Sequence, residues 1–197
     1  MESRCVLEEE QAGFRKFRST SQHVSLLNQN IKDALDKKQI LSAVFIDFKS
    51  AYDLVWRDNL LAKLVNIGIS SNMLSWFNGF LRTRLCRVRY NHSFSRFRTL
   101  RTGLPQGAVS SCILFNIYIN DLISELKKIV GLQCLLFADD LVIWTTSPKN
   151  KAKKLTERTL GEALVVIERW TTLNNMKVNI VKTFDESFSL THVPFYP

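Results

Sequence analysis

The stretch that decides the fold is Leu135-Leu136-Phe137-Ala138-Asp139-Asp140-Leu141-Val142-Ile143-Trp144. Its two adjacent carboxylates, Asp139 and Asp140, stand between two apolar runs, a pattern that predicts two strands joined by a tight turn. Carboxylates in such a turn lose water, and an unpaired buried charge costs several kcal/mol. A divalent metal ion is the simplest group that would offset this cost, so the turn is a candidate metal site.

A second acidic strand lies upstream, in Ala43-Val44-Phe45-Ile46-Asp47-Phe48. Three carboxylates from two strands can hold two metal ions of the kind that drive phosphoryl and nucleotidyl transfer. Tyr52 follows soon after Asp47, near enough to share the pocket and to screen the 2′ position of a nucleotide sugar. A core aromatic at the end of a strand is the alternative interpretation of Tyr52, and spacing alone favours it.

The composition is that of a folded protein. The 197 residues are 46% hydrophobic and 23% charged, which suits one domain with a core, or two small lobes, rather than a disordered chain. No apolar run has the length and character of a membrane helix, and no signal peptide is visible. We therefore expect no membrane partner and an intracellular location, in the cytoplasm or the nucleus.

Positive charge is concentrated in one segment of the chain. The formal net charge is +9, and no acidic residue occurs between Asp58 and Asp121. The cations of that segment are Lys63, Arg82, Arg84, Arg87, Arg89, Arg96, Arg98 and Arg101. Such a basic stripe suits a phosphate backbone, because each neutralised phosphate releases counterions. A solvated strand face with ordinary arginines is the alternative.

Hydrophobic periodicity predicts the order of the helices and strands. Helices are expected over 21–38, from Asp58 to Gly68, from 70 to 81, over 108–128 and over 150–173. Strands are expected around Asp47, over 84–90 and 94–99 as a hairpin, on both sides of the acid pair and over 176–180. Ser19, Thr20 or Ser21 would cap the first helix and Asp58 the second. The tail from Asp185 shows no clear pattern. This order indicates an α+β fold with the acids on a central antiparallel sheet.

The segment Gly103-Leu104-Pro105-Gln106-Gly107 reads as a loop before a long helix. Its two glycines permit close backbone approach, and Pro105 stiffens the chain. Gln106 offers an amide to a base, a sugar or a phosphate. Taken alone, the segment is equally consistent with an ordinary turn.

Together these segments resemble motifs A, B and C of reverse transcriptases, in the usual order. Motif A corresponds to Phe45-Ile46-Asp47 with Ala51-Tyr52-Asp53, motif B to residues 103–107, and motif C to residues 137–140. Residues 11–20 resemble the fingers motif of non-LTR (LINE-like, Jockey-type) retrotransposon polymerases, and residues 114–122 and 179–183 also look like that group. Phe17 stands where the commonest fingers pattern has glycine, and Ser111-Cys112 stands where Ser-Pro is common.

The resemblance implies a right-hand polymerase palm, a central antiparallel sheet backed by helices, with partial fingers and no thumb. Residues 1–40 would be partial fingers, and residues 41–183 the palm with an inserted fingers segment at about 58–102. Residues 184–197 would be a truncated tail. The whole would be one reverse transcriptase domain fragment.

The resemblance also implies roles for individual residues. Asp47, Asp139 and Asp140, together with Phe48, would form the site of two Mg²⁺ ions, for which Mn²⁺ can substitute. The nucleotide-binding residues would be Tyr52, Pro105, Gln106, Gly107, Arg15 and Lys16. The nucleic acid would lie on Arg18, Arg84, Arg87, Arg89, Arg96, Arg98 and Arg101. Lys182 would act as a general acid near the triphosphate; a solvated surface lysine is the alternative.

The function expected from this resemblance is that of an RNA-directed DNA polymerase domain of a non-LTR retrotransposon. Its partners would be an RNA template, a DNA primer and deoxynucleoside triphosphates. An inactive truncated remnant that only binds nucleic acid is the second hypothesis. Another two-metal nucleotidyltransferase on a similar palm is the third, and the glutamine loop and the fingers motif argue against it.

Overall fold

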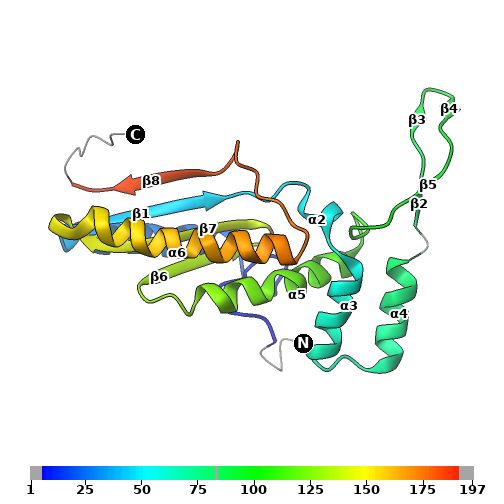
Figure 1. Cartoon of the computed structure of the whole chain (residues 1–197), viewed down its shortest axis with the longest axis horizontal. Coiled ribbons are helices and arrows are strands. Elements are labelled where there is room, and N and C mark those ends of the chain that lie inside the picture. The colour runs from blue at the N-terminus through cyan, green and yellow to red at the C-terminus, as the bar shows by residue number, and fades with distance from the viewer. Residues whose placement is uncertain (1–5, 83, 191–197) are drawn as a thin grey trace.

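A computed structural model of the chain describes residues 6–82 and 84–190. Its centre is a four-stranded antiparallel sheet (Figure 1). The strands are β6 (Leu132–Phe137), β7 (Asp140–Pro148), β1 (Gln39–Ile46) and β8 (Phe184–Phe188), in that spatial order. The predicted strands on both sides of the acid pair therefore exist, and they pair with the strand that precedes Asp47.

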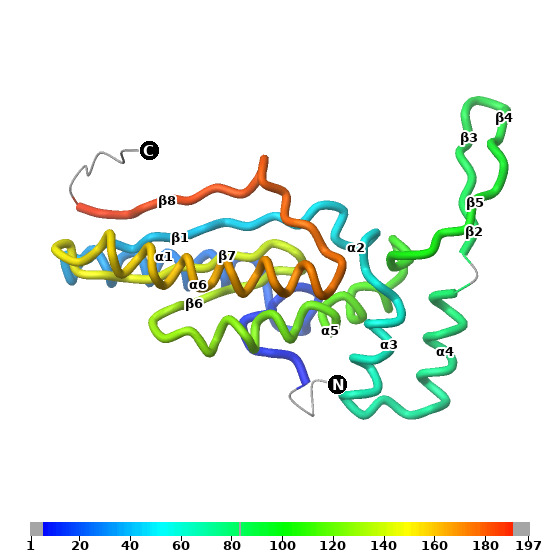
Figure 2. The backbone as a smooth tube through the Cα atoms, viewed as in Figure 1, coloured from blue at the N-terminus to red at the C-terminus, as the bar shows by residue number. Residues whose placement is uncertain are grey.

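Helices cover both faces of the sheet (Figures 1 and 2). The side chains of β1 alternate between the faces, as the two-residue period of a strand requires. Val44 and Ile46 enter the larger core with α5 (Val109–Leu126) and α6 (Ala152–Leu173). Leu41 and Ala43 enter a smaller core with α1 (Thr20–Asp36). This arrangement confirms the α+β palm that the sequence predicts.

A helical and hairpin insertion connects β1 to α5. It contains α2 (Ala51–Leu54), α3 (Arg57–Asn66), α4 (Ser71–Leu81), β2 (Leu85–Cys86), β3 (Arg89–Tyr90), β4 (Ser93–Phe94) and β5 (Arg98–Thr99). The strands pair β2 with β5 and β3 with β4, so the predicted hairpin is confirmed as two short ladders. The hairpin projects away from the sheet beyond α4 (Figure 1).

The helix ends follow the predicted caps with one exception. Ser19 caps α1 in a capping box with Gln22, and Ser70 is the N-cap of α4. Asp58 is not a cap, because α3 begins one residue earlier and its N-cap is Trp56. Asp58 instead lies in the first turn of α3, where a negative charge interacts favourably with the helix dipole.

The end of the chain departs from the sequence prediction in two places. Residues 176–180 do not form a strand, because only Val178 makes an isolated bridge, to Phe48. The strand of this region is β8, inside the tail that showed no pattern. Strand β8 lies at the sheet edge and is mostly exposed, so it lacks the apolar alternation that reveals a strand. Residues 191–197 of the predicted tail lie outside the described residues.

A short 3₁₀ turn, Lys149–Lys151, precedes helix α6, which begins at Ala152, two residues after the expected start at residue 150. Within the described parts of the chain, no helix is long and apolar enough to cross a membrane.

Candidate active site

Three acids lie at one end of the sheet. The pairing of Ile46 with Leu141 brings Asp47, directly after β1, beside Asp140, the first residue of β7. Asp139 occupies the turn between β6 and β7. Burial raises the pKa of Asp139 above its ordinary value, and the charges of Asp140 and Asp47 raise it further. The acids are therefore close enough to repel one another.

Two residues near the C-terminal end contact the first of these acids. The side-chain amide of Asn179 donates to Oδ2 of Asp47 at 2.7 Å. The Nζ of Lys182 lies 4.0 Å from the same oxygen, on a side chain that is 69% exposed. Lys182 was predicted from the sequence as a site residue, whereas Asn179 was not. The only signal for Asn179 was its place at the start of the last segment that resembles the polymerase group.

The three acids offer the carboxylate oxygens that a metal ion binds, but their side chains do not surround a single point. Among residues 6–82 and 84–190, no three His, Cys, Asp or Glu side chains converge as a ready-made metal site. The charges of Asp140 and Asp47, which raise the pKa of Asp139, nevertheless make a fitting environment for a cation, and Mg²⁺ commonly takes only one or two protein carboxylates with water and phosphate oxygens. The residues present therefore suit a divalent ion that arrives with phosphates.

The predicted contribution of Phe48 is restricted by its position in the core. Its ring is 3% exposed and packs edge-on against Trp170, with ring centroids 6.2 Å apart. In the bridge between Phe48 and Val178, the main-chain carbonyl of Asp47 accepts from Asn179 N–H, and Lys49 N–H donates to the Lys177 carbonyl. The bridge therefore does not use the carbonyl of Phe48 itself. A metal could therefore be reached only by the main-chain carbonyl of Phe48.

A cavity of about 480 Å³ holds most of the predicted nucleotide-binding residues. Its lining includes Asp139, Tyr52, Pro105, Gln106 and Gly107. The structure thus brings motif A, the glutamine loop and the acid turn to one place. Arg15 and Lys16 are not among the residues that line this cavity.

The glutamine loop is held against the segment that carries Tyr52. Leu104 N–H donates to the Tyr52 carbonyl at 2.8 Å, and the Gln106 amide donates to Oδ1 of Asp53 at 2.9 Å. Gly103 has a φ of 82°, and a Cβ there would lie 2.7 Å from the Asp53 carbonyl oxygen. Only glycine fits this close approach without strain.

Tyr52 is at once a core aromatic and a wall of the cavity. Its ring stacks on Phe115 with the centroids 4.5 Å apart. Its hydroxyl is buried and has no hydrogen-bond partner among the described residues. Burial, followed by the nearby Cys112 and Asp139, raises the pKa of the Tyr52 hydroxyl, so the phenol stays neutral.

A second cavity of about 390 Å³ adjoins the other two acids. Asp47, Asp140 and Lys182 line it together with Phe45 and Phe184, whose rings stack 4.9 Å apart. The three carboxylates therefore lie between two cavities, with Asp139 on the first and Asp47 and Asp140 on the second.

The basic residues of the fingers motif contact their own segment. Arg15 donates through Nη1 to the carbonyls of Glu8 at 2.6 Å and Gln11 at 3.0 Å. Arg18 donates to the carbonyl of Glu9 at 2.6 Å. Phe17, which replaces the common glycine, has a φ of 59°, so the position needs the torsion that glycine adopts most easily.

All of the predicted nucleic-acid-binding arginines except Arg18 lie in or next to the hairpin, which projects away from the sheet (Figure 1). Those that are exposed are Arg87, Arg89, Arg96, Arg98 and Arg101, whereas Arg84 is half-buried and donates to the Gly103 carbonyl at 3.3 Å. The guanidinium of Arg87 lies 3.9 Å from the ring centroid of Phe94 and 4.9 Å from that of Phe97. The structure does not bring these arginines to the acids.

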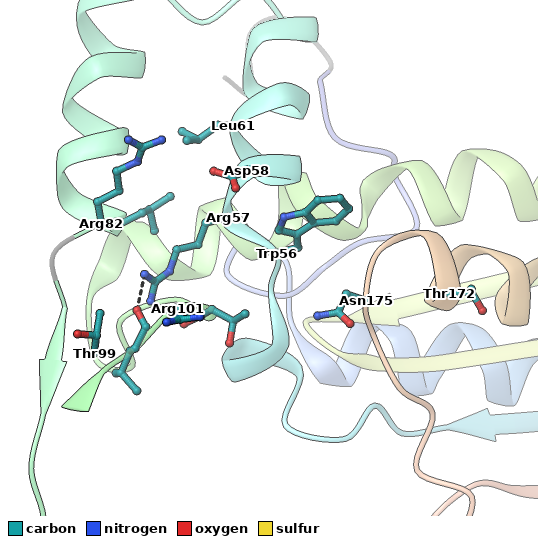
Figure 3. A pocket seen from close by; sticks show the side chains of 12 residues that line it. Trp56, Arg57, Asp58, Leu61, Arg82, Thr99, Arg101, Thr172 and Asn175 are labelled. Carbon is teal, nitrogen blue, oxygen red and sulfur yellow. Dashed lines mark hydrogen bonds between the residues drawn. The ribbon is translucent and has the colours of Figure 1, made fainter.

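The base of the hairpin is fixed by an arginine that sequence reasoning missed. Arg57 is buried and donates to the carbonyls of Leu100 at 2.8 Å and Gly103 at 2.9 Å, and also to Thr102. Figure 3 shows its side chain among the residues that line a cavity at the base of the hairpin. An arginine at the start of a helix resembles a surface charge, so no sequence signal distinguished it. A cavity of about 780 Å³ lies at this junction.

Comparison with known proteins identifies the family. The sequence matches the family described as reverse transcriptase (RNA-dependent DNA polymerase) over residues 1–187. It is 31% identical to a probable RNA-directed DNA polymerase from transposon BS of Drosophila melanogaster, over 96% of this chain and 21% of that protein. It is 26% identical to the RNA-directed DNA polymerase from mobile element jockey of Drosophila funebris, over 91% of this chain and 20% of that protein.

Solved structures agree on the fold. The apo telomerase from Candida Tropicalis, truncated from its C-terminal domain, aligns with a TM-score of 0.65 at 18% identity, over 93% of this chain and 37% of that one. This likeness confirms the palm-and-fingers fold. The chain spans about a fifth of the length of the curated relatives that it matches. The matches confirm the resemblance to Jockey-type non-LTR polymerases, and the chain belongs to the reverse transcriptase family.

Proposed function

We propose that this chain carries out RNA-directed DNA synthesis, adding deoxynucleotides to the 3′-hydroxyl of a DNA primer on an RNA template. The observation that carries the proposal is the position of Asp47, Asp139 and Asp140 at one end of the sheet, between two cavities. One cavity holds Tyr52 and Gln106, as a nucleotide site should, and the other can take a primer end. Membership of the family supports the same chemistry.

Reverse transcriptases generally use divalent metal ions, and we assign two Mg²⁺, or Mn²⁺ in their place, to the three acids and the Phe48 carbonyl. When bound, the ions would supply activation of the primer hydroxyl and neutralisation of charge on the leaving pyrophosphate. Asn179 and Lys182 both approach Oδ2 of Asp47, which leaves Oδ1 as the oxygen for a cation. Asn179 would thus orient the carboxylate.

The residues of the larger of these two cavities would select and hold the nucleotide. The fixed ring of Tyr52 would screen the sugar 2′ position, because stacking on Phe115 prevents it from moving aside. Gln106 and the neighbouring Pro105 and Gly107 would contact the nucleotide and the template. Lys182 would protonate the leaving pyrophosphate as a general acid.

Template and primer would be held by basic residues outside the cavities. The exposed arginines of the hairpin suit a phosphate backbone, and the nearby Phe94 and Phe97 offer stacking surfaces to bases. Lys16, with Arg15 and Arg18, would hold template or triphosphate from the fingers motif through charge-assisted bonds.

Primer extension tests the proposal directly. The substrate is poly(rA)/oligo(dT) with Mg²⁺ and dTTP, and Asp139→Asn is compared with wild type and with Asp36→Asn, a control at an exposed acid on α1. We expect extension by wild type and Asp36→Asn but not by Asp139→Asn. Equal extension by Asp139→Asn would overturn the catalytic assignment. Salt-sensitive RNA binding without any incorporation would favour the nucleic-acid-binding remnant instead.

A further inference from the structure

The turn that carries the catalytic acids is covered by a segment far away in the sequence. Residues 10–12 lie along the outer edge of β6, where Ala12 N–H donates to the Leu136 carbonyl and Leu136 N–H donates to the Glu10 carbonyl, both at 2.9 Å. This pairing places Gln11 beside the last residues of β6, in a parallel bridge with Leu136. The Gln11 side chain therefore lies next to the turn.

The amide of Gln11 satisfies both polar groups of one turn residue. Its Oε1 accepts from the N–H of Ala138 at 3.0 Å, and its Nε2 donates to the carbonyl of Ala138 at 3.2 Å. The same Oε1 accepts from the N–H of Gly13 at 2.8 Å. Gln11 is fully buried, with 0% of its surface exposed. A buried amide with this set of partners fixes the orientation of the peptide that leads into Asp139.

Ala138 needs such support because its backbone is strained. Its φ is 58°, in the left-handed region that residues with a Cβ seldom adopt. Strain of this kind persists only where the surroundings impose it, and it clusters at functional sites. The direction of the next side chain, Asp139, depends on these torsions. Without the Gln11 bonds, the turn could relax and carry the Asp139 carboxylate away from Asp47.

Two further residues hold Gln11 and its segment against the turn. Gly13 packs so closely that a Cβ there would lie 2.3 Å from the Ala138 nitrogen. Asn116 of α5, itself 1% exposed, donates to the Gly13 carbonyl at 2.6 Å. We refer to Gln11, Gly13 and Asn116 as the clamp. It links the fingers motif, the long palm helix and the acid turn through buried hydrogen bonds.

We propose that Gln11 is a positioning residue for metal binding: its amide fixes the Ala138 backbone and so directs the Asp139 carboxylate toward the site shared with Asp47. The inference rests on the proposed function, since it assigns the metal to these acids. It goes further by making a buried residue of the fingers motif, which touches neither metal nor nucleotide, necessary for the metal site. Glutamine suits the position because one planar group both donates and accepts.

The test is Mn²⁺ binding by the full chain, measured from the electron paramagnetic resonance signal of free Mn²⁺, beside dTTP incorporation. Gln11→Met keeps the length and burial of the side chain but removes both hydrogen-bonding groups. Gln11→Glu keeps the acceptor for the Ala138 and Gly13 amides and loses only the donor. Gln133→Met, at an exposed glutamine on β6, is the matched control.

We expect Gln11→Met to weaken Mn²⁺ binding and slow incorporation by roughly tenfold or more, the loss typical when a group that orients a metal ligand is removed. Gln11→Glu should show a smaller loss, and Gln133→Met should match wild type. Gln11→Met with wild-type Mn²⁺ affinity would overturn the inference, even if its thermal midpoint were lower, because a residue that only stabilises the fold would not alter the affinity of folded protein.

A second background keeps the test decisive if Gln11→Met does not fold. Glycine adopts the φ of Ala138 at little cost, so Ala138→Gly should fold without the clamp. Adding Gln11→Met to Ala138→Gly should weaken Mn²⁺ binding, because glycine is free to leave the φ that directs Asp139 once the Gln11 amide no longer holds it, and no change there would contradict the inference. If Asp139→Asn weakens Mn²⁺ binding but Gln11→Met does not, only the clamp fails. If the wild-type protein neither binds Mn²⁺ nor incorporates dTTP, both the proposed function and the role of the clamp fail.

Discussion

The acid turn and the basic hairpin are built in opposite ways. At the turn, Ala138 is buried, and its two polar groups are fixed by Gln11. On the hairpin, all residues of the four short strands are exposed, and the guanidinium groups of Arg87 and Arg89 lie over the ring of Phe94. Bond-forming chemistry requires carboxylates held in one geometry, whereas a phosphate backbone requires only accessible positive charge. Substitutions at the two regions should therefore have different effects.

The largest effect is expected at the acids themselves. Asp47→Asn removes one charge from the proposed metal site and should lower incorporation by roughly 10³-fold, since metal ions supply several kcal/mol to the transition state. RNA binding should change little, because the hairpin is separate. Steady-state dTTP incorporation and filter binding measure the two effects. A large loss of RNA binding by Asp47→Asn would contradict the separation of chemistry from binding.

A backbone clash at the turn should have the next largest effect. Gly13→Ala places a Cβ 2.3 Å from the Ala138 nitrogen, so the segment or the turn must shift, at a cost of about 1–3 kcal/mol in unfolding free energy. Gly161→Ala in α6 is the matched control, because its Cβ would meet no atom within 4 Å. That control should stabilise the protein by about 0.5–1 kcal/mol. Urea unfolding followed by circular dichroism gives both values, and similar free energies for the two variants would disprove the close contact.

On the hairpin, the loss of charge should alter binding but not chemistry. Arg96→Gln with Arg98→Gln removes two exposed cations. If both contact phosphates of single-stranded RNA, the slope of log affinity against log salt should fall by roughly 1.4, at about 0.7 per contact. Fluorescence anisotropy over a salt series measures the slope. An unchanged slope would favour the alternative, a solvated strand face.

The smallest effect is expected at an ion pair that holds the N-terminal segment on α5. A hydrogen bond from Lys127, followed by one from Ser124, lowers the pKa of Glu8 below its ordinary value of 4.5. The Lys127 Nζ lies 2.8 Å from Oε2 of Glu8. A carboxyl with a lowered pKa stabilises the fold above that ordinary value, and the stabilisation is lost as the pH falls through the folded-state pKa.

Glu8→Gln should therefore cost at most about 1 kcal/mol at pH 7, the usual range for an accessible pair. The difference from wild type should shrink as the pH falls below the ordinary pKa of a glutamate, and vanish below the lower, folded-state pKa of Glu8. Glu9→Gln, at an exposed neighbouring residue, is the control and should leave the stability unchanged both at pH 7 and at acidic pH. Thermal melts across this pH range measure how the stability difference between wild type and Glu8→Gln changes with pH. A difference that grew on acidification would contradict the prediction.

The sequence predicted the palm because its strands are buried on both sides and flank acids. The apolar runs around Asp139, the strand before Asp47 and the amphipathic helices all left a periodic signal that local reasoning can read. Strand β8 left none, since an exposed edge strand has no apolar face to bury. Asp58 carried a cap signal, but α3 begins one residue before it.

The supporting residues of the site were beyond local reasoning for a different reason. Gln11 contacts Ala138 across 127 residues of sequence, and Arg57 contacts Leu100 across 43. Neither a buried amide nor a buried guanidinium can be recognised until the fold supplies its partners. Asn179 is a similar case, because its role depends on the bridge that brings it to Asp47. The three acids could thus be proposed as a site from sequence alone, but the groups that contact and orient them could not.

The most direct test of the central claim is single-turnover dTTP incorporation, from complexes formed at saturating poly(rA)/oligo(dT) in Mg²⁺. Asp139→Asn is compared with the Arg96→Gln, Arg98→Gln variant in the same experiment. If the acid turn performs the chemistry and the hairpin only binds, Asp139→Asn should show no incorporation above background, and the hairpin variant should incorporate at the wild-type rate. Incorporation by Asp139→Asn at the wild-type rate would contradict the account.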